Sequence, residues 1–385
     1  MNDFVTTQFE LRPISEVCEI TLGQSPGGDT YNTEGDGPYF IQGPGAFGWQ
    51  YPELERYCSN PKRMAKTGDV LLAVKPVGGV NLAQDEMCIG RGVTALRMKE
   101  GPNEYLYYFL KWFDQYWDKI GRGSVHKGIT KKDIQTLEIP YPSLPIREKI
   151  VSQLATLDKK IEVNRAMSET LEDIAHVIYT SWFVDYEPFS SGERPENYQT
   201  VSTLGKFING YAFSQDKVTD SGHPIIKIRE LKNGVSDNSD YYPEKEDVDE
   251  KYHLSAGDIL FSWSASLDVF LWKNNWGLLN QHIYNVHPSD GFSREFVYFS
   301  LKQALDHIEN LADGTTMSHI NRSDLDEVSV ECLTPEMRER FTETVRPLLN
   351  EIIRLKQETE SLAELRDYLL PQLLSGEVRL GGDDA

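Results

Sequence analysis

Two segments of the chain carry apolar residues at spacings that alternate between three and four, the heptad pattern of helices that pack along a seam. In the first segment these positions are Ile150, Leu154, Leu157, Ile161, Leu171, Ala175, Ile178 and Trp182. In the second they are Phe341, Val345, Leu348, Ile352, Leu355, Leu362, Leu369 and Leu373. The remaining seam positions are polar: Asn164, Ser168, Thr359 and Arg366. Polar seam residues lower stability but fix register and partner choice.

Both predicted helices have recognisable ends. The first opens near Pro145 and ends before Pro188, and the second opens near Pro335 and ends at Ser375-Gly376. Proline is tolerated in a first helical turn, and glycine follows many helix ends. About 40 residues at 1.5 Å each give a rod of roughly 60 Å. Either each rod packs on its own domain, or the two pair along their matching seams. We favour pairing, with the domains at opposite ends.

The rest of the chain has the pattern of short strands broken by Gly, Pro and Asn clusters. Strands are predicted at residues 70–74, 225–228, 259–261 and 283–286. Residues 104–120 and 293–311 have the length and period of helices. This mixture is typical of α+β domains.

The chain is an internal duplication. The pattern Gly123-Ser124-x4-Ile129-x3-Asp133-Ile134-x2-Leu137-x-Ile139 returns 191 residues later (123 to 314, 139 to 330) as Gly314-Thr315-x4-Ile320-x3-Asp324-Leu325-x2-Val328-x-Val330. Gly68-Asp69-Val70-Leu71 returns as Gly257-Asp258-Ile259-Leu260, and residues 17–23 resemble residues 204–210. The same shift carries the first predicted helix onto the second. We therefore predict an α+β fold of two duplicated α/β domains and two long helices, divided as residues 1–144, 145–187, 188–333 and 334–380.

Composition narrows the class of protein. The 385 residues are 39% hydrophobic and 26% charged, as in globular proteins of more than one domain. No apolar run approaches the ~18 residues of a membrane span, and the N-terminus lacks the flanks of a secretory signal. The four cysteines are far apart and fit reduced thiols better than disulfides or zinc ligands. We expect a cytoplasmic protein without a membrane partner.

The net charge of −21 opposes nucleic-acid binding, which uses Lys and Arg to neutralise phosphates. Residues 1–144 hold 15 basic and 18 acidic side chains, a net of −3, and residues 191–334 hold 12 and 23, a net of −11. Neither half is basic. DNA binding would therefore depend on small local clusters, or on positive surface from a partner.

No active-site motif has a credible context. Gly43-Pro44-Gly45-Ala46-Phe47-Gly48 fits the dinucleotide-binding pattern, but no helix start follows it. Gly23-Gln24-Ser25-Pro26-Gly27 fits the nucleophile elbow, but Pro26 has no N–H for an oxyanion hole. We interpret both as turns. Phosphate-binding loops, His-Glu-x2-His and the Asn/Asp-Pro-Pro-Tyr/Phe run of amino-methyltransferases are absent. We expect no catalysis, no cofactor and no metal in this chain.

Local polar clusters occur at duplicated positions. The loop that opens with Gly123 carries Ser124, His126, Lys127, Lys131 and Lys132, and its counterpart carries Thr315, Thr316, His319, Asn321 and Arg322. Short side chains beside Lys or Arg on a glycine-led loop suit phosphate contacts. The structural alternative, that Thr130 and Asn321 are helix N-caps, is compatible with this because helix N-termini also bind phosphate.

A second cluster follows each Gly-Asp-Val/Ile-Leu strand. In the first half it comprises Lys75, Asn81 and Arg91, and in the second half Ser264, Ser266, Gln281 and His282. Lys227 and Arg229, which precede the second of these strands, are further candidates for DNA contact. Arg is suited to guanine edges, and Asn or Gln to adenine edges. The two halves differ most here while their frames agree, as expected of domains that read different sequences. For any single residue, ordinary solvation of a loop is the alternative.

The chain resembles the specificity (S) subunit of type I restriction–modification systems over nearly its whole length. The resemblance rests on the Gly-Asp-Val/Ile-Leu strands, the Gly-Ser/Thr…Ile…Asp-Ile/Leu…Ile/Val strands, Leu144-Pro-Ile-Arg-Glu-Lys-Ile-Val at the first helix and Leu369-Leu-Pro-Gln-Leu-Leu-Ser-Gly-Glu377 at the end of the second. Phe261-Ser-Trp-Ser…Leu279-Asn-Gln-His-Ile283 also resembles a recurrent variant of the recognition domain.

The resemblance implies two target-recognition domains on a pseudo-two-fold antiparallel coiled coil, each reading half of a bipartite double-stranded DNA target. The helices would act as a ruler for the unread spacer. Two methyltransferase (M) subunits would dock on the chain, bring S-adenosylmethionine and flip adenines out for methylation. A restriction (R) subunit would join for cleavage. Two alternatives remain: a standalone nuclease or methyltransferase with duplicated domains, and a protein-interaction scaffold that does not bind DNA.

Overall fold

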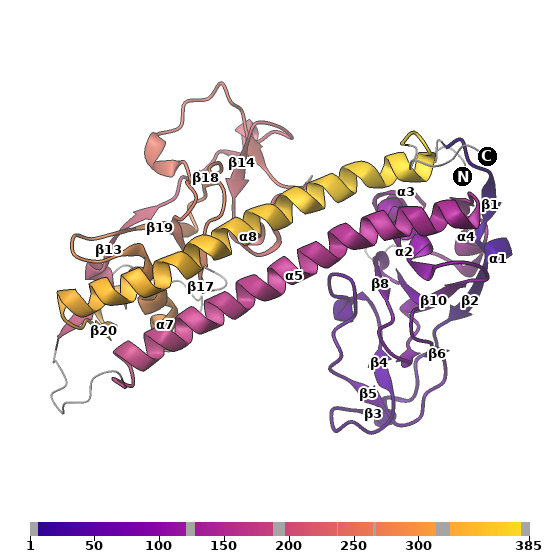
Figure 1. Cartoon of the computed structure of the whole chain (residues 1–385), viewed down its shortest axis with the longest axis horizontal. Helices are drawn as coiled ribbons and strands as arrows, with labels where there is room; N and C mark the ends of the chain where they lie inside the picture. The colour runs from indigo at the N-terminus through magenta and orange to yellow at the C-terminus, as the bar shows by residue number, and fades with distance from the viewer. Residues whose placement is uncertain are drawn as a thin grey trace. The chain divides into compact units, whose positions relative to one another are not determined.

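A computed structural model describes residues 7–120, 128–187, 197–236, 238–264, 267–312 and 324–378. The chain divides into two compact units (Figure 1). Unit 1 comprises residues 1–160 and 362–385, and unit 2 comprises residues 161–361. The two long helices, α5 (Leu144–Phe183) and α8 (Pro335–Ser375), each contribute one part to either unit. Their bounds predicted from the sequence are 145–187 and 334–380.

Unit 1 is built on a four-stranded antiparallel sheet of order β2-β10-β7-β8. Its strands are β2 (Cys18–Leu22), β10 (Val93–Met98), β7 (Val70–Val74) and β8 (Val77–Leu82). Helix α2 (Asn103–Phe113) packs on β7, β8 and β10, and seven of its eleven residues are buried. All five residues of β7 are buried as well, because β7 lies inside the sheet under this helix.

Smaller elements complete unit 1. A five-stranded sheet has the order β3-β5-β4-β9-β6, with β3 (Tyr31–Asn32), β5 (Tyr57–Cys58), β4 (Tyr39–Ile41), β9 (Met87–Ile89) and β6 (Met64–Ala65). Strand β1 (Leu11–Pro13) pairs with β11 (Glu138–Pro140). The short helices are α1 (Ile14–Val17), α3 (Trp117–Ile120) and α4 (Lys131–Gln135). The helix predicted at residues 104–120 is thus α2 and α3, separated by a 3-10 turn at Asp114–Tyr116.

Unit 2 repeats this plan. Its main sheet has the order β13-β19-β16-β17, with β13 (Gly205–Asn209), β19 (Ile283–Pro288), β16 (Ile259–Ser262) and β17 (Asp268–Leu271). A second sheet comprises β15 (Tyr241–Tyr242), β14 (His223–Ile226) and β18 (Leu278–Leu279), and β12 (Tyr198–Thr200) pairs with β20 (Ser329–Glu331). Its helices are α6 (Ile228–Asn233) and α7 (Arg294–Ala312). The strand predicted at residues 225–228 is displaced, because Ile228 begins α6.

The duplicated Gly-Asp pairs have a common physical basis. Gly68 and Gly257 have φ values of +81° and +95°, which favour glycine because it has no Cβ. The carboxylates of Asp69 and Asp258 then accept backbone N–H bonds from three residues earlier, at 2.7 and 2.9 Å. Each pair therefore closes a turn and starts the central strand of its sheet. This local signal makes the repeat visible in the sequence.

The two long helices run antiparallel within each unit. In unit 1, Ile150 and Leu154 of α5 share a core with Leu370 and Leu373 of α8. In unit 2, the Phe183 ring of α5 lies 5.1 Å from the Phe341 ring of α8. Helix pairing is therefore confirmed. The alternative is also partly correct, because Tyr179 of α5 contacts Phe299 of α7 with ring centroids 6.1 Å apart.

The buried face of the helices differs from the predicted seam. Leu157, Leu171, Ile178, Trp182, Leu348, Thr359, Leu362 and Leu369 are only half-buried. The seam pattern misses eight buried residues: Arg147, Asp158, Tyr179, Phe183, Thr342, Leu349, Leu370 and Leu374. Each helix packs on its partner and on a domain at once, so the buried stripe is wider than a two-helix seam and is rotated from it.

Polar residues interrupt this buried face. Arg366 of α8 donates to Asp158 of α5 at 2.9 Å, and Tyr108 of α2 donates to the other oxygen of Asp158 at 2.8 Å. Burial acts to lower the pKa of Arg366, but the hydrogen bond to Asp158 and the charge of Asp367 outweigh it and raise the pKa. Asn164 and Ser168 are buried in unit 2, and their side-chain polar atoms have no partner among the described residues. Three of the four polar seam residues are therefore buried.

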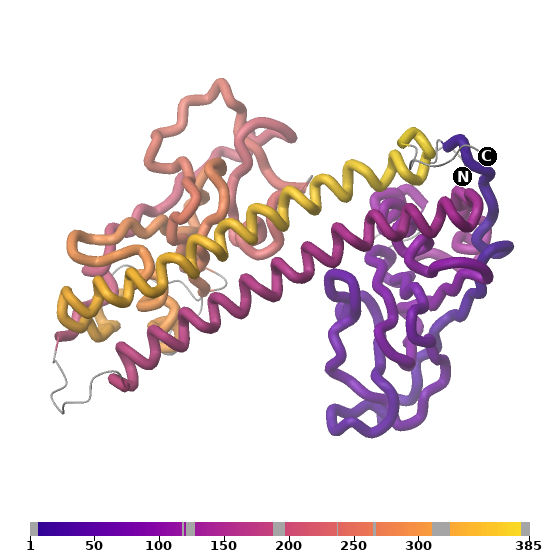
Figure 2. Tube along the Cα trace, viewed as in Figure 1, coloured from indigo at the N-terminus to yellow at the C-terminus, as the bar shows by residue number. Residues whose placement is uncertain are grey.

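The two ends of the described chain meet in unit 1. The backbone N–H of Gln8 donates to the carbonyl of Ser375 at 3.0 Å, and the Thr7 hydroxyl donates to the carbonyl of Leu374 at 3.1 Å. Figure 2 shows the first and last coloured segments side by side. The N-terminal segment thereby holds the end of α8 in the unit that also contains the start of α5.

Candidate nucleic-acid interface

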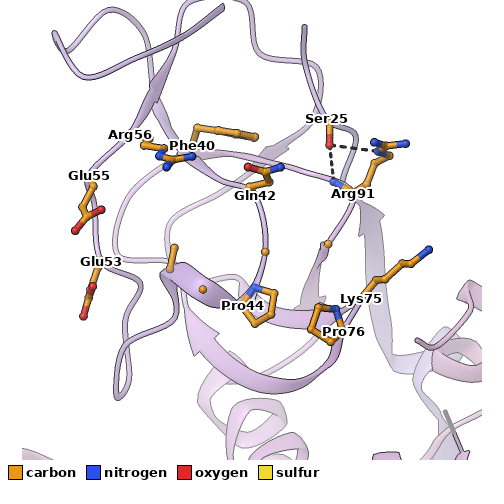
Figure 3. A pocket seen from close by; sticks show the side chains of 14 residues that line it. Ser25, Phe40, Gln42, Pro44, Glu53, Glu55, Arg56, Lys75, Pro76 and Arg91 are labelled. Carbon is orange, nitrogen blue, oxygen red and sulfur yellow. Dashed lines mark hydrogen bonds between the residues drawn. The ribbon is translucent and has the colours of Figure 1, made fainter. Parts of the chain in front are cut away.

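A hollow of about 840 Å³ opens in unit 1 where four strands end (Figure 3). Ser25 follows β2, Gln42 follows β4, Lys75 follows β7 and Arg91 follows β9, and all four line the hollow. These residues are distant in sequence, and the four-stranded and five-stranded sheets of unit 1 bring them together. Its wall also includes Phe40, Pro44, Glu53, Glu55, Arg56 and Pro76.

Glycines let the loops of the hollow approach closely. A Cβ on Gly23 would lie 2.0 Å from the carbonyl oxygen of Gly90, and one on Gly92 would lie 2.7 Å from that of Gln42. Any larger residue would force these loops apart. Of the glycines in the two motif-like segments, Gly23 and Gly48 therefore serve close backbone contact. The interpretation of the Gly43–Gly48 segment as a turn is confirmed, since it contains a short 3-10 turn at Pro44–Ala46. Residues 23–27 form neither helix nor strand, and a 3-10 turn at Gly28–Thr30 follows them.

Arg91 is held in place by Ser25. The Ser25 Oγ accepts from the backbone N–H of Arg91 at 3.2 Å and from its Nε at 3.4 Å. This leaves the two terminal guanidinium nitrogens without a hydrogen bond among the described residues. They form the planar donor fork that suits a guanine edge or a phosphate.

The hollow has both basic and acidic side chains on its wall. Arg56, Lys75 and Arg91 are exposed, and none forms an ion pair within the part of the chain that the structure describes. Glu53 and Glu55 lie on the wall away from Arg91 (Figure 3). Free cations are concentrated here although the chain as a whole carries −21. The expectation of small local basic clusters therefore has a physical counterpart in unit 1.

Gln42 is a site residue that the sequence patterns did not single out. Its side chain is exposed and has no hydrogen-bond partner among the described residues, and it lies centrally in the hollow (Figure 3). Gln42 stands directly after a short apolar strand and before a glycine, and this position could have indicated a polar side chain at the end of a strand. Arg56, which points over the same hollow, had no sequence signal that distinguished it from other surface cations.

The backbone frame of the hollow recurs in unit 2. Four N–H to carbonyl bonds of unit 1 are Gly23 to Val93 (3.0 Å), Gln24 to Ile89 (3.0 Å), Gly90 to Ile41 (2.8 Å) and Val93 to Gly90 (3.0 Å). Their counterparts are Gly210 to Ile283 (3.1 Å), Tyr211 to Leu279 (2.8 Å), Asn280 to Ile226 (3.2 Å) and Ile283 to Asn280 (3.1 Å). Residues 90–92 are therefore equivalent to residues 280–282, and Arg91 to Gln281.

The side chains on the second frame differ. Gln281 and His282 are exposed, and their Nε2 atoms lie 3.4 Å apart. Lys227, at the position of Gln42, pairs with Asp240. Arg229 pairs with Glu230 at 2.7 Å. These two cations are already neutralised by their own unit, which weakens the sequence-based case for their contact with DNA.

Two predicted residues are inaccessible to a ligand. Asn81 is 1% exposed, and its amide donates to the carbonyls of Gly48 and Val80, both at 2.9 Å. Ser264 is also buried. Asn81 has a structural role, because its amide joins β8 to the loop at Gly48. Their burial removes both side chains from the surface that a ligand can reach and weakens the prediction that Asn81 and Ser264 contact DNA.

Lys131 and Lys132 begin α4 and are exposed. Thr130 is confirmed as the N-cap of this helix, since its Oγ accepts from the N–H of Asp133 at 3.3 Å. Just before it, the N–H of Ile129 donates to the carbonyl of Val74 at 3.1 Å, so this segment passes close to Lys75. The other predicted residues lie outside the described residues: Ser124, His126, Lys127, Ser266, Thr315, Thr316, His319, Asn321 and Arg322.

Neither a metal cluster nor a membrane-spanning helix occurs in the described part of the chain. It contains no group of three or more His, Cys, Asp or Glu side chains placed to hold a metal ion. Within the same residues, no helix combines the length and the apolarity that a bilayer crossing requires. The four cysteines are buried, and each is a free thiol. Burial raises the pKa of Cys332 to about 11, so its thiol is protonated at neutral pH.

Comparison with known proteins identifies the family. The family model of the type I restriction modification DNA specificity domain matches residues 7–173 and again residues 195–359. The chain belongs to this family. The two matches cover the first and the second copy of the duplication, so the repeat found in sequence is a repeat of the specificity domain. The chain is a DNA specificity subunit of the type I restriction–modification class.

Several relatives agree with this assignment. The chain is 27% identical to the type I restriction enzyme MjaIX specificity subunit of Methanocaldococcus jannaschii, covering 83% of this chain and 79% of that one. It is 25% identical to the HindI specificity subunit of Haemophilus influenzae, covering 82% and 88%. A putative MjaX specificity subunit of M. jannaschii is 36% identical, but over only 40% of this chain and 37% of that relative.

A solved structure supports the fold. The S subunit of a type I restriction-modification system from M. genitalium matches with a TM-score of 0.60 and 17% identity, covering 97% of each chain. At this identity the likeness supports the fold alone, which is the predicted α+β plan of two domains and two long helices.

Proposed function

We propose that each unit reads one half of a bipartite double-stranded DNA target, and that the chain guides a separate methyltransferase without catalysing any reaction itself. The observation that carries this proposal is the backbone frame of the hollow. Its four hydrogen bonds recur in unit 2, but it presents Arg91 in unit 1 and Gln281 in unit 2. Equal frames with unlike side chains suit a target whose two halves differ in sequence. The exposed cations of the first hollow suit phosphate contacts beside the bases.

The surface of the long helices supports two equivalent partners. Ile174 and Val177 of α5 are 46% and 65% exposed, and Leu365 and Tyr368 of α8 are 45% and 67% exposed. The second pair is the first pair shifted by 191 residues (174 to 365, 177 to 368). Large apolar side chains at i and i+3 are the pattern by which one helix receives another. A feature present twice with equal exposure suits two copies of one partner, and we propose that these are methyltransferase subunits docking through helices.

The docking proposal has a direct test. Ile174→Glu with Val177→Glu should remove one methyltransferase subunit, and Leu365→Glu with Tyr368→Glu should remove the other. Native mass spectrometry of the complex would then show one methyltransferase subunit instead of two. Asp173→Lys and Glu364→Lys are matched controls, because both are exposed and directly precede the apolar pairs. Stoichiometry unchanged by either glutamate pair would contradict the proposed surface.

S-adenosylmethionine and catalysis would belong to the partners. We propose that the methyltransferase subunits bring S-adenosylmethionine and flip adenines from the duplex, and that a restriction subunit joins for cleavage. A measurable affinity of the isolated chain for S-adenosylmethionine would favour the enzyme alternative instead.

The function is tested by mapping DNA methylation in cells that express this chain with its cognate methyltransferase subunit, against cells that lack the chain. A bipartite N6-methyladenine motif that depends on the chain is the expected result. No new motif, together with a stable and salt-insensitive complex, would favour the scaffold alternative over DNA reading.

A further inference from the structure

We propose that Arg91 and Gln281 are the principal base-reading residues of the two units, Arg91 for a guanine and Gln281 for an adenine. This inference rests on the proposed DNA-reading function and adds the residues and the bases. In the backbone frame of the hollow, residues 90–92 and 280–282 take the same place in their units.

The equivalence is fixed by backbone geometry. Strand β9 pairs in parallel with β4, with Ile89 opposite Ile41, and β18 pairs in parallel with β14, with Leu279 opposite Ile226. Arg91 and Gln281 each stand two residues beyond such a pair. Each is the middle residue of a three-residue loop, residues 90–92 or 280–282, and the repeated hydrogen bonds hold the residues on either side of it. A side chain that projects from such an anchored loop has little backbone entropy to lose on binding.

Their functional groups are left accessible. The Nε of Arg91 is occupied by Ser25 Oγ at 3.4 Å, so the free edge of the guanidinium is the Nη1–Nη2 fork. This fork matches the O6 and N7 acceptors of guanine in the major groove. Gln281 is exposed, and its backbone N–H makes the bond to the Tyr211 carbonyl at 3.0 Å. Its side-chain Nε2 lies 3.4 Å from His282 Nε2, which leaves the second N–H of the amide and its Oε1 for a ligand. A primary amide matches the N6 donor and N7 acceptor of adenine.

Other candidates around the two frames are less suited to reading. Asn81 and Ser264 are buried. Lys227 and Arg229 are engaged with Asp240 and Glu230. Lys75 is free, but an ammonium group is a point charge without the planar donor pair that distinguishes bases. Gln42 also presents an exposed amide, but the equivalent residue of unit 2 is Lys227, which is paired with Asp240. Among the described positions of the frame, the one held by Arg91 and Gln281 presents an exposed planar hydrogen-bonding group on an anchored backbone in both units.

The test compares base preferences position by position. The full chain, assembled with its methyltransferase subunits, selects from a library of duplexes randomised over both half-sites. Arg91→Lys should reduce discrimination at one guanine of one half-site by about 5- to 150-fold, the range that corresponds to one good bidentate base contact. Gln281→Ala should relax one adenine in the other half-site only. Lys75→Ala, in the same hollow as Arg91, should lower affinity evenly without changing preference.

The outcomes separate the two proposals. If the unaltered complex selects no target, the proposed function fails. If it selects a bipartite target but Arg91→Lys lowers affinity evenly at all positions, Arg91 is a phosphate contact and the reader assignment fails. A relaxed position that was not guanine, or changes in both half-sites, would also overturn it. Because Arg91 is exposed and lysine keeps its charge, unchanged circular dichroism and melting temperature check that the variant is folded.

Discussion

Removing Arg366 should destabilise unit 1 strongly, because it leaves a buried carboxylate without its cation. The side chain of Asp158 is 1% exposed and that of Arg366 is 7% exposed. Losing one partner of a buried ion pair typically costs about 3–5 kcal/mol. That is a large part of the about 5–15 kcal/mol by which a domain is stable. We therefore expect Arg366→Met to lower the free energy of unfolding by about 3–5 kcal/mol.

The assay is urea unfolding followed by circular dichroism. The urea concentrations at the midpoint of unfolding are compared between variants whose free energies fall with urea at the same slope. Arg354→Met is the matched control, since Arg354 lies on the same helix but is 56% exposed and pairs only with exposed or half-buried glutamates. Its effect should be much smaller because solvent screens such pairs.

Compensating variants test the cause. Adding Asp158→Leu to Arg366→Met removes the stranded charge but leaves the Tyr108 hydroxyl without its acceptor, which costs about 1–3 kcal/mol. Adding Tyr108→Phe should recover most of that remainder. If Arg366→Met shifts the midpoint no more than Arg354→Met, or if the triple variant is no more stable than the single one, the buried-charge reasoning is refuted.

Three further predictions concern local features. Thr130→Ala should cost about 1 kcal/mol of stability by removing the N-cap of α4, and Thr130→Ser should restore it in the same melting experiment. Gly376→Ala should cost at least about 1 kcal/mol, because its φ is +81° and a Cβ would lie 2.7 Å from the Gln8 amide; equal melting temperatures would contradict this. Lys127→Ala should weaken DNA binding with little change in base preference and should flatten the salt dependence of binding. A lost base preference at unchanged affinity would argue against a phosphate contact.

Much of the architecture could be predicted from the sequence because its signals are local. The Gly-Asp turns before the central strands depend on the positive φ of Gly68 and Gly257 and on a carboxylate three residues from its donor. The cap at Thr130 and the end of α8 before Gly376 likewise depend on adjacent residues. Features that neighbouring residues decide recur whenever the sequence recurs, so the order of residues alone reveals the duplication and the two long helices.

The buried faces of the helices were predicted less well. A heptad pattern assumes one partner helix, but α5 and α8 each contact a domain as well as each other. The assumption assigned Leu157 to the core where the structure buries Asp158. A buried carboxylate is stable there only because Arg366 and Tyr108, 208 and 50 residues away, supply hydrogen bonds.

The candidate site shows the same division between local and distant information. Residue types alone suggested Lys75, Arg91, Gln281 and the neighbouring polar residues, because side-chain chemistry is written in the sequence. The sequence did not show which of these side chains are accessible. Folding buries Asn81 and pairs Lys227 with Asp240. It also brings Ser25, 66 residues away in the sequence, into contact with Arg91. The order of residues was enough to predict the repeat, the long helices and the kinds of side chain available for binding. The tertiary structure decided which polar groups stay free, because hydrogen bonds and ion pairs form between residues that only folding makes neighbours.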